Sequence, residues 1–204
     1  MRTIDIYEFH ELSSDQKVRA IELYKVKYAE VLFDDADAQY LKESMELLAE
    51  EKGYPELKAE FSLSYSQGDG VRFTGELDSA DIEALAQRLL EGKDLKHLKW
   101  VAKSSEFSMF ISSNGSRYVH ELTMYCYFSY DNSSSSFSIP RIQSLLERLE
   151  RLILNDLRSI CKECERMGYR EIEFHESDDY AMGCLDANNY EFEVSEEGEV
   201  VRIL

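Results

Sequence analysis

The sequence lacks a long hydrophobic run and contains only four cysteines. No stretch approaches the roughly 20 apolar residues that a membrane-spanning helix needs. The first residues, MRTIDIYEFHEL, carry acidic side chains where a signal peptide has an apolar run. The cysteines are unevenly spaced, and a chain of 204 residues does not depend on disulfides for its core. We therefore expect a protein of the cytoplasm that has reduced thiols and no membrane contact.

Catalytic and cofactor motifs are also missing. The sequence contains no GxSxG, HExxH, P-loop or dinucleotide-binding pattern, which favours a non-enzymatic protein without a cofactor or metal. Cys161 and Cys164 have CxxC spacing, but they lie in an amphipathic segment where Cys161 continues the apolar stripe. A four-cysteine zinc site with Cys126 and Cys184 is geometrically conceivable. Core positions are the simpler interpretation.

Basic residues are scarce relative to acidic ones. Lys and Arg number 23 against 41 Asp and Glu, which gives a net charge of −18. Such a charge repels nucleic acid and anionic membranes and attracts basic surfaces. We therefore expect no direct binding to nucleic acid or to a membrane. Hydrophobic residues make up 44%, enough for a sizeable core. Solubility is the simplest explanation of the charge, and binding of a basic partner is the functional one.

Helical and strand periodicities alternate along the chain. Ser13 and Gln16 form a capping-box pattern that starts a helix reaching about Val31, and a second helix begins near Asp34 and stops at Gly53. Alternating apolar residues at 57–65 and 71–77, joined by a glycine-rich link, predict a hairpin. The dipeptide Asn114-Gly115 predicts another. Seven residues after it are expected to face one way: Tyr118, His120, Leu122, Met124, Cys126, Phe128 and Tyr130.

The longest amphipathic segment runs from Ile139 to about Met167, and Gly168 is expected to end its helix. A short helix at 178–187 and a final hairpin follow. The order predicts an α+β fold: an antiparallel sheet of about five to seven strands with helices packed mainly on one face. We interpret 1–204 as a single domain with a helical pair (13–53), a sheet-and-helix core (55–167) and an acidic helix-hairpin (170–204).

The acidic C-terminal stretch is the first candidate site. Residues 171–199 contain eleven Asp or Glu and no Lys or Arg. Glu191 and Glu193 alternate with apolar residues, so both should project from one strand face about 7 Å apart, close to the spacing of successive phosphates. A solvated face that also protects a strand edge is the alternative. The residues expected to bind a partner are Glu191, Glu193, Glu196, Glu197, Glu199, Asp178 and Asp179.

The link Ser66-Gln67-Gly68-Asp69-Gly70 is the second candidate. Its glycines permit left-handed backbone, and Asp69 can bind either a cation or the amides of its own turn. A ligand or metal role would use Gln67, Asp69 and His120. Turn chemistry is the simpler interpretation, because one Asp and one Gln are too few ligands for a metal.

Three stretches together resemble a known group of proteins. They are Ile6 to Ser13 with the helix that follows, the turn 66–70 with Phe73-Thr74-Gly75, and 187–192 with Glu197-Gly198. They span nearly the whole chain and are similar to a loosely defined group of tailed-phage and prophage proteins, some labelled antitoxin-like. The resemblance implies a phage or mobile-element protein acting in a bacterial cytoplasm. It carries no site residues with it.

These observations lead to one hypothesis and two alternatives. The leading hypothesis is a non-enzymatic binder of a basic surface on a host nucleic-acid-handling protein, an anti-CRISPR-like inhibitor that acts by nucleic-acid mimicry. One alternative is a small-ligand or metal-binding protein that uses the Gly68-Asp69-Gly70 hairpin. The other is an antitoxin-type partner of a basic toxin.

Overall fold

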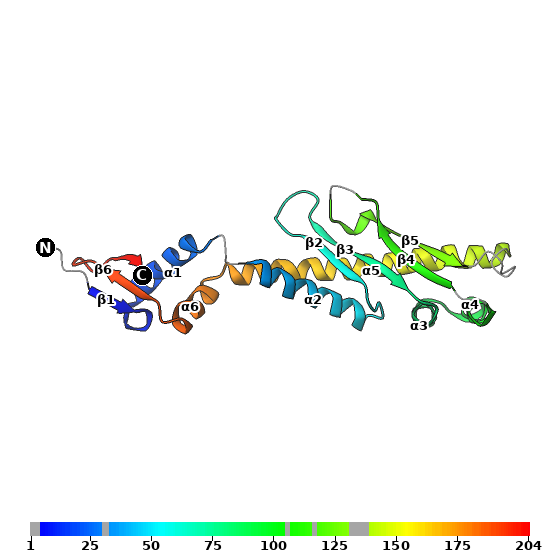
Figure 1. Ribbon diagram of the computed structural model, residues 1–204, viewed down its shortest axis with the longest axis horizontal. Helices are drawn as coiled ribbons and strands as arrows, with labels where there is room; N and C mark the ends of the chain where they lie inside the picture. The colour runs from blue at the N-terminus through cyan, green and yellow to red at the C-terminus, as the bar shows by residue number, and fades with distance from the viewer. Residues whose placement is uncertain (1–4, 30–32, 105–106, 116–117, 131–138) are drawn as a thin grey trace. The chain divides into compact units, whose positions relative to one another are not determined.

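The chain folds into two compact units, each with its own antiparallel sheet. The computed structural model describes residues 5–29, 33–104, 107–115, 118–130 and 139–204. One unit combines residues 1–38 with 169–204 and is called the terminal unit; the other, residues 39–168, is called the central unit. Seven strands lie in a three-stranded and a four-stranded sheet within these described ranges (Figure 1). The predicted α+β class is confirmed, and the strands form two sheets.

The terminal unit places two helices on one face of a small sheet. The strands have the order β1-β6-β7, so β6 is central. Phe192 and Val194 of β6 are buried against Ala20 of α1 and Leu185 of α6. The elements complete in this unit are β1 (Asp5–Glu8), the 3₁₀ helix η1 (Phe9–Glu11), α1 (Ser14–Lys27), α6 (Asp178–Ala187), β6 (Glu191–Val194) and β7 (Val200–Ile203).

The predicted capping box at the start of α1 is confirmed. Gln16 N–H donates to Ser13 Oγ at 3.4 Å, and Ser13 N–H donates to Gln16 Oε1 at 2.9 Å. These bonds satisfy amide groups that the first helical turn leaves unpaired. The helix ends at Lys27, and Val31, its predicted end, lies outside the described residues.

The central unit carries the four-stranded sheet in the order β2-β3-β4-β5. The long helix α5 runs along its inner face (Figure 1). Cys126 on β5 donates its S–H to the carbonyl of Glu150 on α5, and Phe128 N–H donates to the Glu150 carboxylate at 3.1 Å. The elements that lie wholly or mostly in this unit are α2 (Asp35–Glu51), β2 (Lys58–Ser62), β3 (Gly70–Leu77), α3 (Ser79–Leu89), α4 (Gly92–Ser104), β4 (Phe107–Ser113), the 3₁₀ helix η2 (Glu121–Thr123), β5 (Met124–Tyr130) and α5 (Pro140–His175). The first residues of α2 and the last residues of α5 belong to the terminal unit.

The hairpin predicted at Asn114-Gly115 is wrong in its length. Strand β4 ends at Ser113, which pairs with Met124, so the connection between the strands spans 114–123. Within it, η2 interrupts the alternation that the sequence suggested. Tyr118 and Leu122 are therefore exposed and do not share the inner face that Met124 begins.

The helix end predicted at Gly168 is also wrong, since α5 continues to His175. Gly168 does not have the positive φ of a helix terminus. A Cβ at this position would overlap the end of the Leu63 side chain and lie 3.3 Å from Leu41 and Met45. The glycine is explained by close approach of neighbouring side chains rather than by helix termination.

Candidate functional site

The negative charge is concentrated in the terminal unit. Its 74 residues contain 20 Asp and Glu against 7 Lys and Arg, a net charge of −13. The 130 residues of the central unit contain 21 acidic and 16 basic residues, a net charge of −5. Two sequence segments far apart in the chain therefore combine into one strongly acidic unit.

Glu191 and Glu193 lie on the outer face of the terminal sheet. Their neighbours Phe192 and Val194 are buried, so the predicted alternation along β6 is present. Because β6 is flanked by β1 and β7, these glutamates do not protect a sheet edge. Glu193 lies 3.9 Å from Arg202, whereas Glu191 is opposite Glu8 across the ladder. The like charges of Glu8 and Glu191 are therefore neighbours on adjacent strands.

The turn between β6 and β7 presents three more acidic residues. Glu196, Glu197 and Glu199 are all exposed. The turn is closed by Gly198 N–H, which donates to the carbonyl of Ser195, and by Gln16 Nε2, which donates to the carbonyl of Gly198 at 2.9 Å. Gln16, the third helical residue in the capping box of α1, thus holds the acidic turn in position.

Asp178 and Asp179 start α6, where the helix dipole favours negative charge. Asp178 pairs with Lys25 of α1 at 2.8 Å. Since α1 and α6 cover the inner face of the sheet, these aspartates and Glu191 with Glu193 lie on different sides of it. The expected partner-binding residues do not form one phosphate-spaced row.

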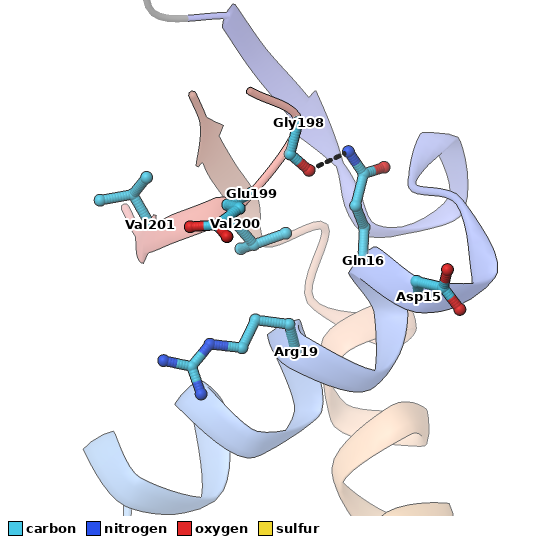
Figure 2. A pocket seen from close by; sticks show the side chains of 7 residues that line it. All are labelled: Asp15, Gln16, Arg19, Gly198, Glu199, Val200 and Val201. Carbon is cyan, nitrogen blue, oxygen red and sulfur yellow. Dashed lines mark hydrogen bonds between the residues drawn. The ribbon is translucent and has the colours of Figure 1, made fainter. Parts of the chain in front are cut away.

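Two open grooves run along the exposed side of α1, one on each flank. The first, about 610 Å³, is lined by Asp15, Gln16 and Arg19 and by residues 198–201 of the acidic turn and β7. Figure 2 shows Gln16 reaching from α1 to the Gly198 carbonyl, while the Arg19 side chain extends sideways from α1. The second, about 500 Å³, lies between α1 and the start of α6 and also contains Arg19. Both grooves together are called the α1 surface: Asp15, Gln16, Val18, Arg19, Ile21, Glu22, Lys25, Val26, Asp178 and residues 198–201.

The α1 surface combines apolar and acidic groups. Val18 is 59% exposed and Val26 is 79% exposed, although valine usually lies inside. Arg19 and Lys25 are engaged by Glu22 and Asp178 at 2.8 Å each. Asp15 and Glu199 have no ion pair within the described ranges. The surface is therefore a shallow apolar strip with uncompensated negative charge at its edge.

His175 is a buried polar residue that the sequence analysis did not single out. Its Nδ1 lies 3.5 Å from Asp37, its Nε2 lies 3.6 Å from Glu171, and its ring stacks on Tyr180 with centroids 4.3 Å apart. It connects the start of α2 to the end of α5 within the terminal unit. Only the extension of α5 beyond Gly168 places it there, so no local sequence signal could have identified it.

Asp69 is satisfied by its own turn. The carboxylate, 9% exposed, accepts the N–H groups of Ser64 at 2.6 Å and Ser66 at 2.9 Å. It also accepts the hydroxyl groups of Ser62, Ser64 and Ser66. Five donors from the chain occupy the positions that a cation would take. This geometry supports the turn interpretation, and Gln67 is exposed beside it.

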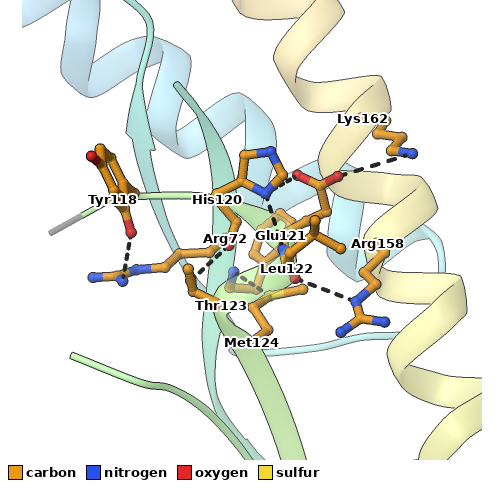
Figure 3. Close-up of polar contacts among 10 residues, drawn as sticks. Arg72, Tyr118, His120, Glu121, Leu122, Thr123, Met124, Arg158 and Lys162 are labelled. Atoms are coloured by element: carbon orange, nitrogen blue, oxygen red, sulfur yellow. Dashed lines mark hydrogen bonds and ion pairs between the residues drawn. The ribbon is translucent and has the colours of Figure 1, made fainter. Parts of the chain in front are cut away.

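His120 lies beside the turn, as the ligand hypothesis requires, but it is not on a strand. A Cβ built at Gly70 would be 3.3 Å from His120 Cδ2. His120 caps η2, where its Nδ1 accepts Leu122 N–H at 3.1 Å. The same Nδ1 lies 2.9 Å from the carboxylate of Glu121 (Figure 3). The imidazole therefore stabilises the connection between β4 and β5.

Glu121 is the least expected residue of this cluster, because its carboxylate is buried. An Nδ1 lone pair that accepts Leu122 N–H cannot also donate to Glu121, which leaves Glu121 Oε2 without a hydrogen bond among the residues that the structure describes. Lys162 on α5 lies 3.9 Å from Oε1, and Arg158 Nε donates to the Glu121 carbonyl at 3.4 Å. The cluster attaches η2 to α5.

The four cysteines are divided between the two units. Cys126, Cys161 and Cys164 belong to the central unit and Cys184 to the terminal unit. Within the described ranges, no group of three or more His, Cys, Asp or Glu could hold a metal ion. Burial, followed by the charge of Glu150, raises the pKa of Cys126 to about 12. Burial, followed by Glu163, raises the pKa of Cys164 to about 12.

These shifts predict unreactive thiols in the central unit. The thiolate is the nucleophile, so a pKa raised by three units lowers its population about a thousandfold at neutral pH. The pKa of Cys161 is raised as well, mainly by burial. At neutral pH a thiol reagent should modify at most Cys184 rapidly, and all four cysteines should react after unfolding in guanidinium chloride. Rapid native labelling of Cys126 or Cys164, located by peptide mass spectrometry, would contradict this prediction.

Comparison with protein-family models assigns the chain to one family. The model of a domain of unknown function, DUF8835, matches residues 28–180. The chain belongs to this family. The DUF8835 match includes the whole central unit and stops before the β6–β7 hairpin, so Glu191 to Glu199 lie outside it. Comparisons with curated proteins and with solved structures found no match. None of the helices in the described ranges is long and apolar enough to cross a membrane.

Proposed function

We propose that this protein is a binding protein whose terminal unit docks on a basic surface of another protein, where it competes with nucleic acid. The observation that carries the proposal is the net charge of −13 on the 74 residues of the terminal unit. A surface built to bind phosphates presents Lys and Arg to any dense array of carboxylates. Competition with nucleic acid requires carboxylates that face the Lys and Arg of the partner, and it does not require that these carboxylates form one regular row.

Several carboxylates of this unit are free to meet such a partner. Glu191, Glu197, Glu199 and Asp179 have no ion pair within the described part of the chain, and all four are exposed. Exposed charges that are already paired would contribute little. These four are therefore expected to contribute more to association than Asp178 and Glu193, which have basic neighbours.

The α1 surface supplies the apolar contact that charge alone lacks. An interface gains most of its affinity from buried apolar anchors, and charges at its rim set the association rate and the partner choice. Val18 and Val26 offer anchors beside Asp15 and Glu199. The complementary partner has apolar residues flanked by Lys or Arg.

The resemblance to phage and prophage proteins supplies the proposed context. A phage protein of this charge would act in the bacterial cytoplasm and inhibit a host nucleic-acid-handling protein, in the manner of an anti-CRISPR inhibitor. An antitoxin would use the same surface, and it would differ in that the captured partner is toxic when expressed alone.

A glutamate-to-glutamine variant tests the proposal. Replacing Glu191, Glu193, Glu196, Glu197 and Glu199 by glutamine should weaken binding of the captured partner at least about tenfold at low salt and flatten its salt dependence. The partner is first captured from bacterial lysate with the wild-type chain, and its affinity is then measured at several salt concentrations. Added DNA should compete with the wild-type chain for it.

A matched control keeps the total charge change the same. Five exposed glutamates of the central unit are replaced instead: Glu43, Glu50, Glu51, Glu91 and Glu147. This control should bind nearly as well as the wild-type chain. Equal losses in both variants would mean that only net charge matters, and unchanged affinity in the first variant would refute the proposed site.

A further inference from the structure

The outer face of the four-stranded sheet in the central unit carries a row of aromatic rings. Phe110 on β4 is directly opposite Tyr127 on β5, with ring centroids 5.6 Å apart and planes inclined by 20°. Tyr125 continues the row, 6.2 Å from Tyr127 at 19°. The three rings are therefore nearly parallel and cross two adjacent strands.

These rings are not part of the hydrophobic core. Their strand neighbours Met109 and Ile111 are buried on the inner face, so the side chain of Phe110 points the other way. Tyr127 is 46% exposed and Tyr125 is 39% exposed. Cross-strand aromatic pairs stabilise a sheet, but this role alone does not require an exposed, aligned row.

A carboxylate extends the same row. Glu76 on β3 is directly opposite Phe110, so Glu76, Phe110 and Tyr127 lie side by side across three strands. Glu76 is exposed and has no ion pair within the described part of the chain. The basic residues on this face, Arg72 and Lys58, are already paired with Glu60 at 2.7 Å and Glu46 at 3.1 Å.

We propose that this face binds an arginine side chain of a partner peptide. A guanidinium group is planar and weakly hydrated, and it stacks on aromatic rings while its N–H groups pair with a carboxylate. Tyr127 and Phe110 supply the rings, and Glu76 at the end of the row accepts the N–H groups. Single-stranded nucleic acid also stacks on aromatic rows, but its phosphates need free cations. On the described strands of this face, the two basic side chains are already paired.

The arginine site does not depend on the proposed docking of the terminal unit. It lies on the central unit, inside the DUF8835 match, whereas the acidic hairpin lies outside that match. Glutamine substitutions at Glu191 to Glu199 should leave arginine binding at this face unchanged. The two proposals can therefore fail separately.

The test uses blocked pentapeptides and the full chain. Binding of Gly-Arg-Gly-Arg-Gly is followed through the tyrosine ring resonances in NMR spectra at physiological salt, where the general attraction of the acidic chain is screened. Peptides with lysine or with uncharged citrulline in place of arginine are the comparisons. The arginine peptide should bind about fivefold more tightly than either, because only arginine combines charge with a flat stacking surface.

Two variants and one control locate the site. Tyr127→Leu keeps an apolar side chain and removes the ring, and it should weaken arginine binding about fivefold. Glu76→Gln should weaken it about threefold. Tyr40→Leu, which removes an exposed tyrosine from α2, should have no effect. Circular dichroism and melting temperature show whether each variant is folded.

Three results would overturn the proposal. Equal affinity for the arginine and lysine peptides would indicate attraction to net charge alone. Unchanged arginine binding in folded Tyr127→Leu would place the site elsewhere. Binding of a single-stranded oligonucleotide, with no arginine binding, would assign the row to nucleobases.

Discussion

Replacing Asp156 by alanine is expected to lower the free energy of unfolding by about 3 kcal/mol. Asp156 lies on α5 and accepts the hydroxyl proton of Tyr54 at 2.7 Å, and Tyr54 is fully buried. Arg88 donates to the same carboxylate through both terminal nitrogens, at 2.6 and 3.2 Å. Without Asp156, a buried hydroxyl loses its acceptor and the Arg88 guanidinium loses its charged partner, while its hydrogen bond to the Lys52 carbonyl remains.

Most of this cost comes from Tyr54 and less from Arg88. The side chain of Arg88 is 44% exposed, so water replaces much of the lost ion pair. Burial, and secondly the hydrogen bond to Asp156, raises the pKa of Tyr54, so the hydroxyl remains a donor through the accessible pH range. Urea denaturation followed by fluorescence reports on the central unit, since Trp100 on α4 is the single tryptophan of the sequence.

Two milder substitutions serve as controls. Tyr54→Phe removes the donor and leaves the Asp156–Arg88 pair intact, so it should cost about 1 kcal/mol. Asp156→Asn keeps an acceptor for Tyr54 and should fall between the two. If Asp156→Ala cost no more than Tyr54→Phe, the carboxylate would not be joining α3, α5 and the segment around Tyr54 as the distances indicate.

Local features of the fold could be predicted where one short segment carries the whole signal. The capping box of Ser13 and Gln16 and the hairpin around 66–70 depend on residues within a few positions of one another. The sequence predicts that Asp69 can bind its own turn, and five hydrogen bonds to its carboxylate come from residues 62–66.

Features that depend on distant pairing could not be predicted. Glu191 and Glu193 lie on a central strand because β1, nearly the length of the chain away, pairs with β6. The same alternation in the sequence would be compatible with an edge strand. The concentration of charge in one unit has the same origin, since residues 1–38 and 169–204 form that unit only in the folded chain.

Glycine and asparagine signals were ambiguous for a different reason. Asn114-Gly115 favours a tight turn in isolation, but η2 provides Glu121 with contacts to α5 that a short hairpin would lose. Glycine is typical of a helix end, but Gly168 lies inside α5, where it leaves room for the side chains of Leu41, Met45 and Leu63. Each residue type has two uses, and tertiary packing selects one.

Gly68 is the position where backbone and packing combine, and Gly68→Ala is expected to cost about 3 kcal/mol. The residue has φ +99°, a conformation that side chains rarely adopt. A Cβ there would also overlap the ring of Tyr118, with Cε1 at 2.8 Å. Backbone strain contributes about 1 kcal/mol and overpacking against a rigid ring about 2 kcal/mol. Urea denaturation followed by Trp100 fluorescence measures the change.

Two further variants separate these contributions. Gly92→Ala has φ +62° with no atom within 4 Å of the added Cβ, so it should show the backbone cost alone, about 1 kcal/mol. In a chain that already carries Tyr118→Ala, Gly68→Ala should cost about 2 kcal/mol less than it costs in the wild-type chain. The ring that the new Cβ would overlap is gone, and only the backbone strain remains. A loss that persists in full without the ring would mean that Gly68 is required only for its backbone. A smaller loss without the ring would show that Tyr118 packs against the 66–70 turn, and that Gly68 provides the space for its ring.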